Sequence, residues 1–351
     1  MINKINDFNA GIIGLGQIGF NIKYDKTRGR IWAHSEAYHA HKKVNLIAAA
    51  DICDNARNKF KKEYPSVDVY SNYEDMIKES EINIISLCTH ESICAEILEN
   101  IIKKYPQIKY IFCEKPVSSD SKKIDTLIKL AEKNDVRVLV NYFRRWQEPF
   151  KILKKIIDEN HYGSIQSLTG YGCTALKTSS SHLLDALISL SPNINSICAF
   201  KQNSYERIVN NSPDPGYSVI MNCENDCVVF LKSTSKDPKN FMFEIDIIFD
   251  EARVIWIDGS KKISVYKFTD KNNYAGDGYS TLNDKPKNIS FHETETMLDS
   301  ISELIYIDTK KNITTSNLRN ASNTVKVIEA IEKSSKQSSI VYLSRGDLYE
   351  E

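Results

Sequence analysis

The sequence lacks a long apolar run, an excess of either charge sign and any closely paired cysteines. No segment approaches the roughly 20 consecutive apolar residues that a membrane-spanning helix needs. The first eight residues, Met1 to Phe8, do not show the charged-then-apolar order of a signal peptide. We therefore expect a cytoplasmic protein with no membrane partner.

Charge is balanced, because Lys and Arg together number 46 and Asp and Glu together also number 46. A nucleic-acid binder needs a basic face that displaces counterions from phosphate. The balance predicts no nucleic-acid partner, although it leaves room for a local basic patch.

Cysteine and histidine do not form a metal-binding pattern. The eight cysteines are dispersed, and Cys223 and Cys227 have no second pair or nearby His to complete a zinc site. Among the seven histidines, His39 and His41 are close in sequence, but side chains two apart diverge on a helix. We expect reduced, structural thiols and no metal.

A chain of 351 residues is too long for one small core, so two domains are expected. The first third alternates uninterrupted apolar strands with amphipathic helices. Strands are predicted at 10–13, 44–50, 82–87, 110–113 and 136–140, and helices at 93–102 and 123–132. Apolar strands without alternation indicate burial on both faces, which is typical of a parallel sheet. Residues 1–143 are thus predicted to be an α/β Rossmann domain with a doubly wound sheet.

From residue 144 onward, strand-like segments follow one another with little helix between them. They lie at 164–171, 195–202, 216–223, 226–234, 241–249, 252–257 and 262–268, and helices are predicted at 181–190, 294–306 and 316–334. Alternation within 241–249 indicates a mostly antiparallel sheet with one open face. Residues 144–351 are predicted to be an α+β domain whose terminal helix packs back on the first domain. An uncovered apolar face favours a homodimer or homotetramer.

A phosphate-binding motif follows the first strand. Gly14-Leu-Gly-Gln-Ile-Gly19 is a G-x-G-x-x-G loop, in which Gly14 turns the chain, Gly16 admits a pyrophosphate and Gly19 allows close packing. Gln17 and Ile18 belong to the same loop. If a helix starts after the loop, the free N–H groups at its N-terminus would bind phosphate. Asp51 directly follows the second strand, where its carboxylate would accept hydrogen bonds from the ribose hydroxyls and repel a 2′-phosphate. The predicted cofactor is NAD rather than NADP.

Several further segments carry a family resemblance. Cys113-Glu-Lys-Pro-Val117 follows the fifth predicted strand, and the matching segments 141–149, 181–185, 325–334 and 340–343 come in the family's order. In this combination the chain resembles the glucose–fructose oxidoreductase, inositol dehydrogenase and rhizopine-catabolism (Gfo/Idh/MocA) family. The resemblance covers nearly the whole chain.

The resemblance implies a nicotinamide-dependent oxidoreductase that acts on a CH–OH group of a sugar, polyol or sugar nucleotide. It makes Lys115 the catalytic lysine, preceding a cis peptide bond at Pro116, and places Glu114 and Thr89 against the cofactor. A partly buried lysine beside a cationic ring can have its pKa lowered toward neutrality, which suits a base that takes a hydroxyl proton. Without the motif, a lone lysine would be interpreted as a solvated surface charge.

The chain departs from the family pattern around its substrate helix. His182 and Asp185 are present, but Thr178 stands where the family commonly has an acid. We expect Lys115 to move the proton, His182 to hold the substrate with Asp185 orienting its ring, and Thr178→Asp to be tolerated. Alternatively, His182 is a structural histidine at a helix start.

The substrate is less well defined. Arg144 and Arg145 could clamp a carboxylate or a diphosphate by bidentate contacts, or one of them could be a solvated charge between domains. The resemblance favours a sugar nucleotide of surface-polysaccharide synthesis. Two alternatives are a glycosidase that uses NAD transiently and a non-catalytic dinucleotide-binding regulator.

Overall fold

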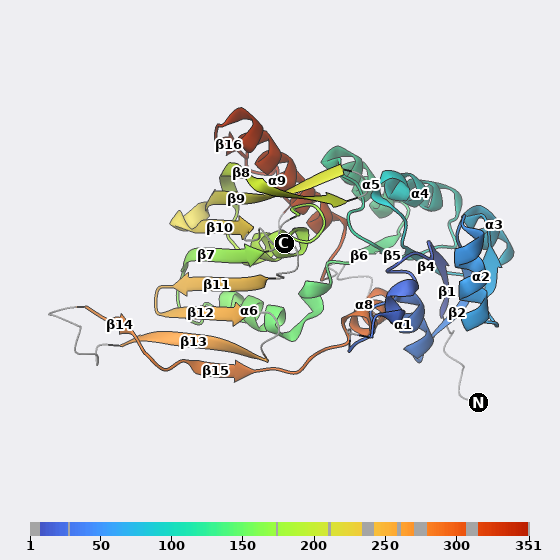
Figure 1. Ribbon diagram of the computed structural model, residues 1–351, viewed down its shortest axis with the longest axis horizontal. Coiled ribbons are helices and arrows are strands. Elements are labelled where there is room, and N and C mark those ends of the chain that lie inside the picture. The colour runs from blue at the N-terminus through green and yellow to red at the C-terminus, as the bar shows by residue number, and fades with distance from the viewer. Residues whose placement is uncertain are drawn as a thin grey trace. The chain divides into compact units, whose positions relative to one another are not determined.

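The computed structural model describes residues 8–26, 29–172, 175–209, 212–233, 242–257, 261–269, 279–306 and 315–349. The chain divides into two compact units, drawn in Figure 1. The first unit contains residues 1–146 and 295–322, and the second contains residues 147–294 and 323–351.

The first unit is built on a six-stranded parallel sheet in the order β3-β2-β1-β4-β5-β6. Its strands are β1 (Phe8–Ile13), β2 (Val44–Ala50), β3 (Asp68–Tyr70), β4 (Ile84–Leu87), β5 (Tyr110–Cys113) and β6 (Arg137–Val140). Its helices are η1 (Asn21–Tyr24), α1 (His34–Ala40), α2 (Asp54–Glu63), α3 (Tyr73–Glu79), α4 (Glu91–Lys104), α5 (Ser121–Lys133), η2 (Phe143–Trp146) and α8 (Thr296–Tyr306). The strand order reverses between β1 and β4, which is where open α/β sheets bind ligands at the carboxyl ends of their strands. The predicted Rossmann fold is confirmed.

The return of α8 to the first unit corrects the predicted division at residues 143 and 144. Met297, Ile301 and Leu304 of α8 are buried in the same core as Ile12 of β1. Because an amphipathic helix joins whichever core covers its apolar stripe, segment 295–322 belongs to the first unit although it follows the second-unit strands in the chain.

The second unit is built on a ten-stranded sheet in the order β14-β13-β12-β11-β7-β10-β9-β8-β16, with β15 paired to β13. Its strands are β7 (Ile165–Gly172), β8 (Ile194–Val209), β9 (Ser212–Cys223), β10 (Val228–Ser233), β11 (Phe243–Phe249), β12 (Ala252–Ile257), β13 (Lys262–Thr269), β14 (Thr281–Leu282), β15 (Lys287–Ser290) and β16 (Val341–Tyr342). Its helices are α6 (Glu148–Asp158), α7 (Ser181–Leu190), η3 (Glu224–Asp226) and most of α9 (Leu318–Gln337). Among the described strands of this sheet, only β7 and β10 pair in parallel, so the mostly antiparallel sheet is confirmed.

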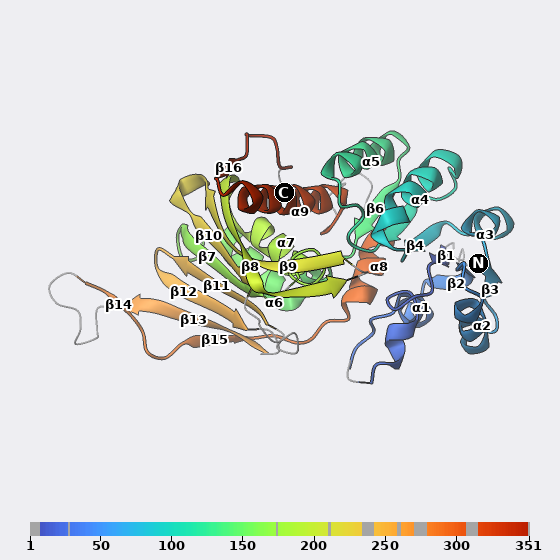
Figure 2. The same cartoon turned by 45° about the horizontal axis from the view of Figure 1, so that its top comes forward.

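One face of this sheet is covered by α6, α7 and α9 (Figure 2). A Cβ at Gly170 of β7 would lie 2.7 Å from Leu187 Cδ1, so α7 packs directly on the strand. Val327 and Ile331 of α9 lie in the same core. The terminal helix thus completes the second unit from Asn323 onward, while its first residues, up to Ser322, belong to the first unit, where Oγ of Ser322 donates to Asp125. That the rest of this helix packs back on the first domain stays a prediction.

The other face of the sheet carries exposed apolar side chains, which alternate along the strands with buried ones. The large ones are Phe200, Ile220, Phe230, Ile257 and Phe268. No helix among the described residues is both long and apolar enough to cross a membrane.

Candidate functional site

The glycine-rich loop after β1 has the geometry that its sequence predicts. Gly14 has φ +96°, and a Cβ there would lie 2.6 Å from the carbonyl oxygen of Cys88. A Cβ at Gly19 would collide with the carbonyl oxygen of Gly14. At Gly16, by contrast, a Cβ would meet nothing within 4 Å. Gly14 and Gly19 are therefore fixed by packing within the protein, whereas Gly16 leaves open space beside its backbone.

Four consecutive amide groups of this loop are available as hydrogen-bond donors. The N–H groups of Gly16, Gln17, Ile18 and Gly19 donate to no acceptor in the part of the chain that the structure describes. The predicted helix does not start here, because a turn leads into the short 3₁₀ helix η1 and α1 begins only at His34. The anion site predicted for this loop would therefore consist of adjacent backbone amides and not of the start of a helix.

Asp51 lies against this loop. Its Oδ2 accepts the N–H of Leu15 at 2.7 Å and its Oδ1 accepts the N–H of Cys53 at 2.8 Å. Close by, the buried hydroxyl of Thr89 has no hydrogen-bond partner among the described residues. Four amides without an acceptor among the described residues, a fixed carboxylate and an unsatisfied hydroxyl in one unit fit a dinucleotide with a pyrophosphate and a ribose.

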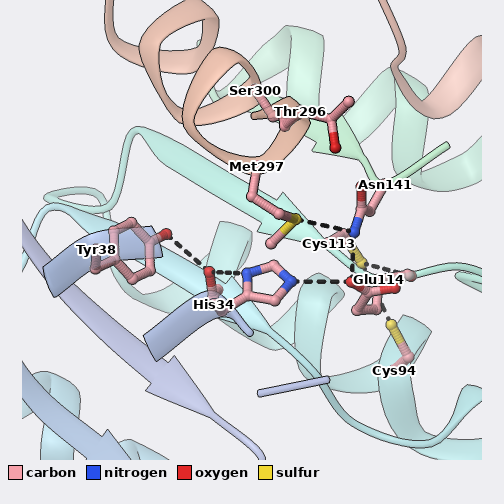
Figure 3. A network of polar contacts seen from close by, with 10 residues as sticks. His34, Tyr38, Cys94, Cys113, Glu114, Asn141, Thr296, Met297 and Ser300 are labelled. Carbon is pink, nitrogen blue, oxygen red and sulfur yellow. Dashed lines mark hydrogen bonds and ion pairs between the residues drawn. The ribbon is translucent and has the colours of Figure 1, made fainter. Parts of the chain in front are cut away.

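Glu114 belongs to a buried polar network that the sequence did not predict (Figure 3). Its Oε1 lies 2.9 Å from Nε2 of His34 and accepts a hydrogen bond from Nδ2 of Asn141 at 2.7 Å. His34 is fully buried, and its Nδ1 lies 2.7 Å from Oγ of Ser86. Oγ of Ser86 lies 2.7 Å from the hydroxyl of Tyr38. One assignment satisfies the chain: Tyr38 donates to Ser86, Ser86 to a neutral His34, and His34 to the Glu114 carboxylate.

This network fixes one oxygen of Glu114 and leaves the other available. Oε2 accepts no hydrogen bond from the described residues, and the side chain is 13% exposed. Glu114 follows β5 and Asn141 follows β6, so both lie at the carboxyl edge of the sheet. The contact between Glu114 and a cofactor stays a prediction, and Oε2 is the oxygen that would make it.

Three thiols surround the same strand ends. Sγ of Cys94 lies 3.4 Å from Sγ of Cys113. Burial, and then the charge of Glu114, raises the pKa of the Cys88 thiol well above its usual range. The hydrogen bond with Cys94, together with burial, raises the pKa of Cys113 in the same way. Burial also raises the pKa of Tyr38. These groups stay protonated at neutral pH and are not nucleophiles.

Lys115 and the two arginines also belong to the first unit. Lys115 is partly exposed, and the peptide bond between it and Pro116 is cis, as predicted. Arg144 and Arg145 lie on η2 and are only 6% and 4% exposed. Arg145 donates to the carbonyl oxygen of Thr315 at 3.4 Å. Neither arginine is the solvated charge that the sequence left open.

The remaining predicted residues belong to the second unit, at the start of α7. His182 is partly buried in the first turn of the helix. Asp185 is fully buried and accepts a hydrogen bond from Oγ1 of Thr324 at 3.3 Å, which favours a supporting role over substrate contact. The hydroxyl of Thr178 donates at 2.9 Å to the carboxylate of Asp214, a residue that the sequence analysis missed.

A family model matches the first unit. Residues 8–142 match the family model GFO_IDH_MocA, described as an oxidoreductase family with an NAD-binding Rossmann fold. In this unit, the chain is similar to the Gfo/Idh/MocA oxidoreductases. The predicted resemblance is confirmed.

Curated relatives match less than half of the chain. Myo-inositol 2-dehydrogenase of Thermotoga maritima is 24% identical over 153 residues, which is 44% of this chain and 41% of the relative. Inositol 2-dehydrogenase of Rhizobium meliloti is 23% identical over 159 residues, which is 45% of this chain and 43% of the relative. The chain thus spans less than half the length of these relatives.

Solved structures match over a longer range. Levoglucosan dehydrogenase in complex with NADH gives a TM-score of 0.76 at 16% identity, covering 96% of this chain and 99% of that chain. An oxidoreductase from Agrobacterium radiobacter in complex with NAD+, L-tartaric acid and magnesium gives 0.70 at 13% identity, covering 96% and 98%. At these identities the likeness shows the fold alone.

Proposed function

We propose that the protein is an NAD-dependent oxidoreductase that transfers hydride between the nicotinamide and a hydroxyl or keto carbon of a sugar or polyol. The proposal rests on one observation: among the described residues, the backbone N–H groups from Gly16 to Gly19, beside the Asp51 carboxylate, have no acceptor. The family match of the same unit supports it.

The first unit supplies the groups that would hold the cofactor. The amides of Gly16, Gln17 and Ile18 would bind the pyrophosphate, and Asp51 would accept the ribose hydroxyls. Thr89 and Oε2 of Glu114 would bind polar groups at the nicotinamide end. Bound NAD supplies the hydride acceptor.

Proton transfer is assigned to Lys115. Oxidation of a secondary alcohol releases a hydroxyl proton, and a neutral lysine amine can accept it. The His34 and Asn141 bonds to Glu114 fix the residue next to Lys115 and so support the position of the amine. In the second unit, we assign substrate positioning to His182 and Thr178, and support of α7 to Asp185.

For the substrate we propose a free polyol or sugar. The sugar nucleotide predicted from the sequence is the alternative, and it would need Arg144 and Arg145 to reach a diphosphate. Both arginines are less than 7% exposed, which does not favour this contact. Relatives carry the names inositol dehydrogenase and levoglucosan dehydrogenase.

One experiment separates the candidate activities. Purified protein is mixed with NAD and, in turn, myo-inositol, levoglucosan and UDP-glucose, while reduced nicotinamide and organic products are followed together. Stoichiometric NADH and a keto product support the proposal. Cleavage of a glycoside without net NADH would indicate the glycosidase, and NADH binding without turnover of any sugar would indicate the regulator.

We also propose that the open face of the second-unit sheet forms a homodimer or homotetramer contact. Register places Ile220 between Cys198 and Phe230 on neighbouring strands, so apolar side chains are contiguous there. Monomers rarely leave such a row exposed to water.

A further inference from the structure

A buried carboxylate holds the loop that leads into α7. Asp214, near the start of β9, is 4% exposed. Its Oδ1 accepts the N–H of Lys177 at 3.0 Å, and its Oδ2 accepts the N–H of Thr178 at 3.0 Å and the hydroxyl of Thr178 at 2.9 Å. The next residue, Pro215, accepts the N–H of Leu176 at 3.2 Å through its carbonyl oxygen. Four hydrogen bonds therefore hold the loop at 176–178 to the start of β9.

The chemistry of this contact determines what Thr178 can offer to a ligand. An ionised carboxylate only accepts hydrogen bonds, so the single proton of the Thr178 hydroxyl must point at Asp214. Toward any other group, the same oxygen acts as an acceptor. Thr178 itself is partly exposed, and it lies four residues before His182 at the start of α7.

The Asp214 carboxylate lies next to the position where the family resemblance places an acid and this chain has none. The family resemblance places an acid at position 178, where this chain has Thr. Asp214 is 36 residues further along the chain, yet its Oδ2 bonds directly to the hydroxyl at that position. An acidic side chain is thus present next to position 178, but it belongs to Asp214 and reaches that position through the Thr178 hydroxyl.

We propose that Asp214 replaces the missing acid by acting through Thr178. Asp214 is a positioning residue: it orients the Thr178 hydroxyl so that its oxygen accepts a hydrogen bond from a substrate hydroxyl. The site would then select substrates that present a hydroxyl donor beside the reacting carbon, as polyols and free sugars do. This inference rests on the proposed function and deepens it.

The first test removes the hydroxyl and keeps the shape. Thr178→Val should raise KM for the polyol or sugar turned over in the screen by roughly tenfold, the effect of one lost hydrogen bond. Thr178→Ser, which restores the hydroxyl, should stay within about threefold of the unmodified protein. The matched control is Thr126→Val, because Thr126 is exposed on α5 and its hydroxyl bonds only to the carbonyl oxygen of Lys122. A purely structural threonine would change the thermal midpoint without changing KM.

The second test moves the charge. Thr178→Asp alone places two carboxylates in contact, and the repulsion should lower both turnover and the thermal midpoint. This reverses the expectation from the sequence that the substitution is tolerated. Adding Asp214→Asn removes the repulsion and returns the carboxylate to position 178, so the double variant should recover most of the activity that Thr178→Asp loses.

The outcomes separate this inference from the proposed function. If Thr178→Val leaves KM within twofold of the unmodified protein, or if Asp214→Asn gives no recovery to Thr178→Asp, Asp214 only holds the loop and the inference is wrong. Either result leaves the oxidoreductase proposal intact. That proposal fails on a different observation, the absence of NAD reduction by the unmodified protein with every compound of the screen.

Discussion

Nε2 of His34 lies 2.9 Å from Oε1 of Glu114, although 80 residues separate the two in the chain. The contact lies inside one unit and links α1 to the end of β5. Because Glu114 directly precedes Lys115, a buried bond to His34 fixes the backbone next to the proposed base.

We predict that His34→Leu destabilises the protein by about 1–3 kcal/mol, because Ser86 and Glu114 each lose a buried partner. Urea denaturation followed by circular dichroism measures this change. His292→Leu is the matched control, since the His292 side chain is exposed and only its backbone N–H bonds, to Glu148. Equal midpoints for the two variants would contradict a role for the His34 network.

The glycines of the loop give a sharper contrast. Gly16→Ala should leave the thermal midpoint unchanged, because the added Cβ meets nothing within 4 Å, but it should weaken NADH binding at least about tenfold by blocking the pyrophosphate. Gly19→Ala should lower the thermal midpoint, because its Cβ collides with the carbonyl oxygen of Gly14. Fluorescence titration with NADH and thermal denaturation measure the two effects.

Gly29→Ala is the control for this pair, since a Cβ there also meets nothing within 4 Å and Gly29 lies in the insertion before α1. It should change neither quantity. NADH binding by Gly16→Ala at the affinity of the unmodified protein would place the pyrophosphate elsewhere.

Asp51 is predicted to set cofactor preference. Asp51→Asn keeps an acceptor at the loop but removes the charge that repels a 2′-phosphate, so the preference for NADH over NADPH should narrow. Asp51→Ala should narrow it further and also lower the affinity for NADH, because the N–H of Leu15 loses its acceptor. Titrations with both reduced cofactors measure this. Tighter binding of NADPH by the unmodified protein would overturn the assignment.

The assembly prediction concerns the open sheet face. Phe230→Lys should convert the oligomer to a monomer in light scattering at micromolar concentration, because it buries a charge in the contact. Ile93→Lys on α4 is the control, since Ile93 is 44% exposed and belongs to the first unit. A monomeric unmodified protein would refute the contact.

The fold could be predicted well from the sequence where burial leaves a strong pattern. The apolar strands Val44–Ala50 and Tyr110–Cys113 and the helix Ser181–Leu190 have the bounds that the sequence predicted. The short strand β3 was missed because three residues carry too little periodicity. Helix α6 was missed as well, although Pro149 is compatible with a helix start.

The site was only partly predictable. Gly14, Asp51 and Lys115 stand in local motifs, so their roles could be proposed from sequence. His34 has no spacing that relates it to Glu114, because the sheet topology alone brings them together. For Asp214 one signal was present, an acid between Pro213 and Pro215 just before the predicted strand at 216–223, but its contact with Thr178 depends on tertiary structure.

The most direct test of the central claim compares the unmodified protein with Lys115→Ala in the NAD and sugar screen. The account predicts that the unmodified protein reduces NAD with a polyol or sugar, and that Lys115→Ala loses about 10²–10⁴-fold in kcat while it binds NADH with almost unchanged affinity. His182→Ala in the same assay should lose less in kcat and more in KM. Near-full turnover by Lys115→Ala, or no reduction of NAD by the unmodified protein with any compound of the screen, would contradict the account.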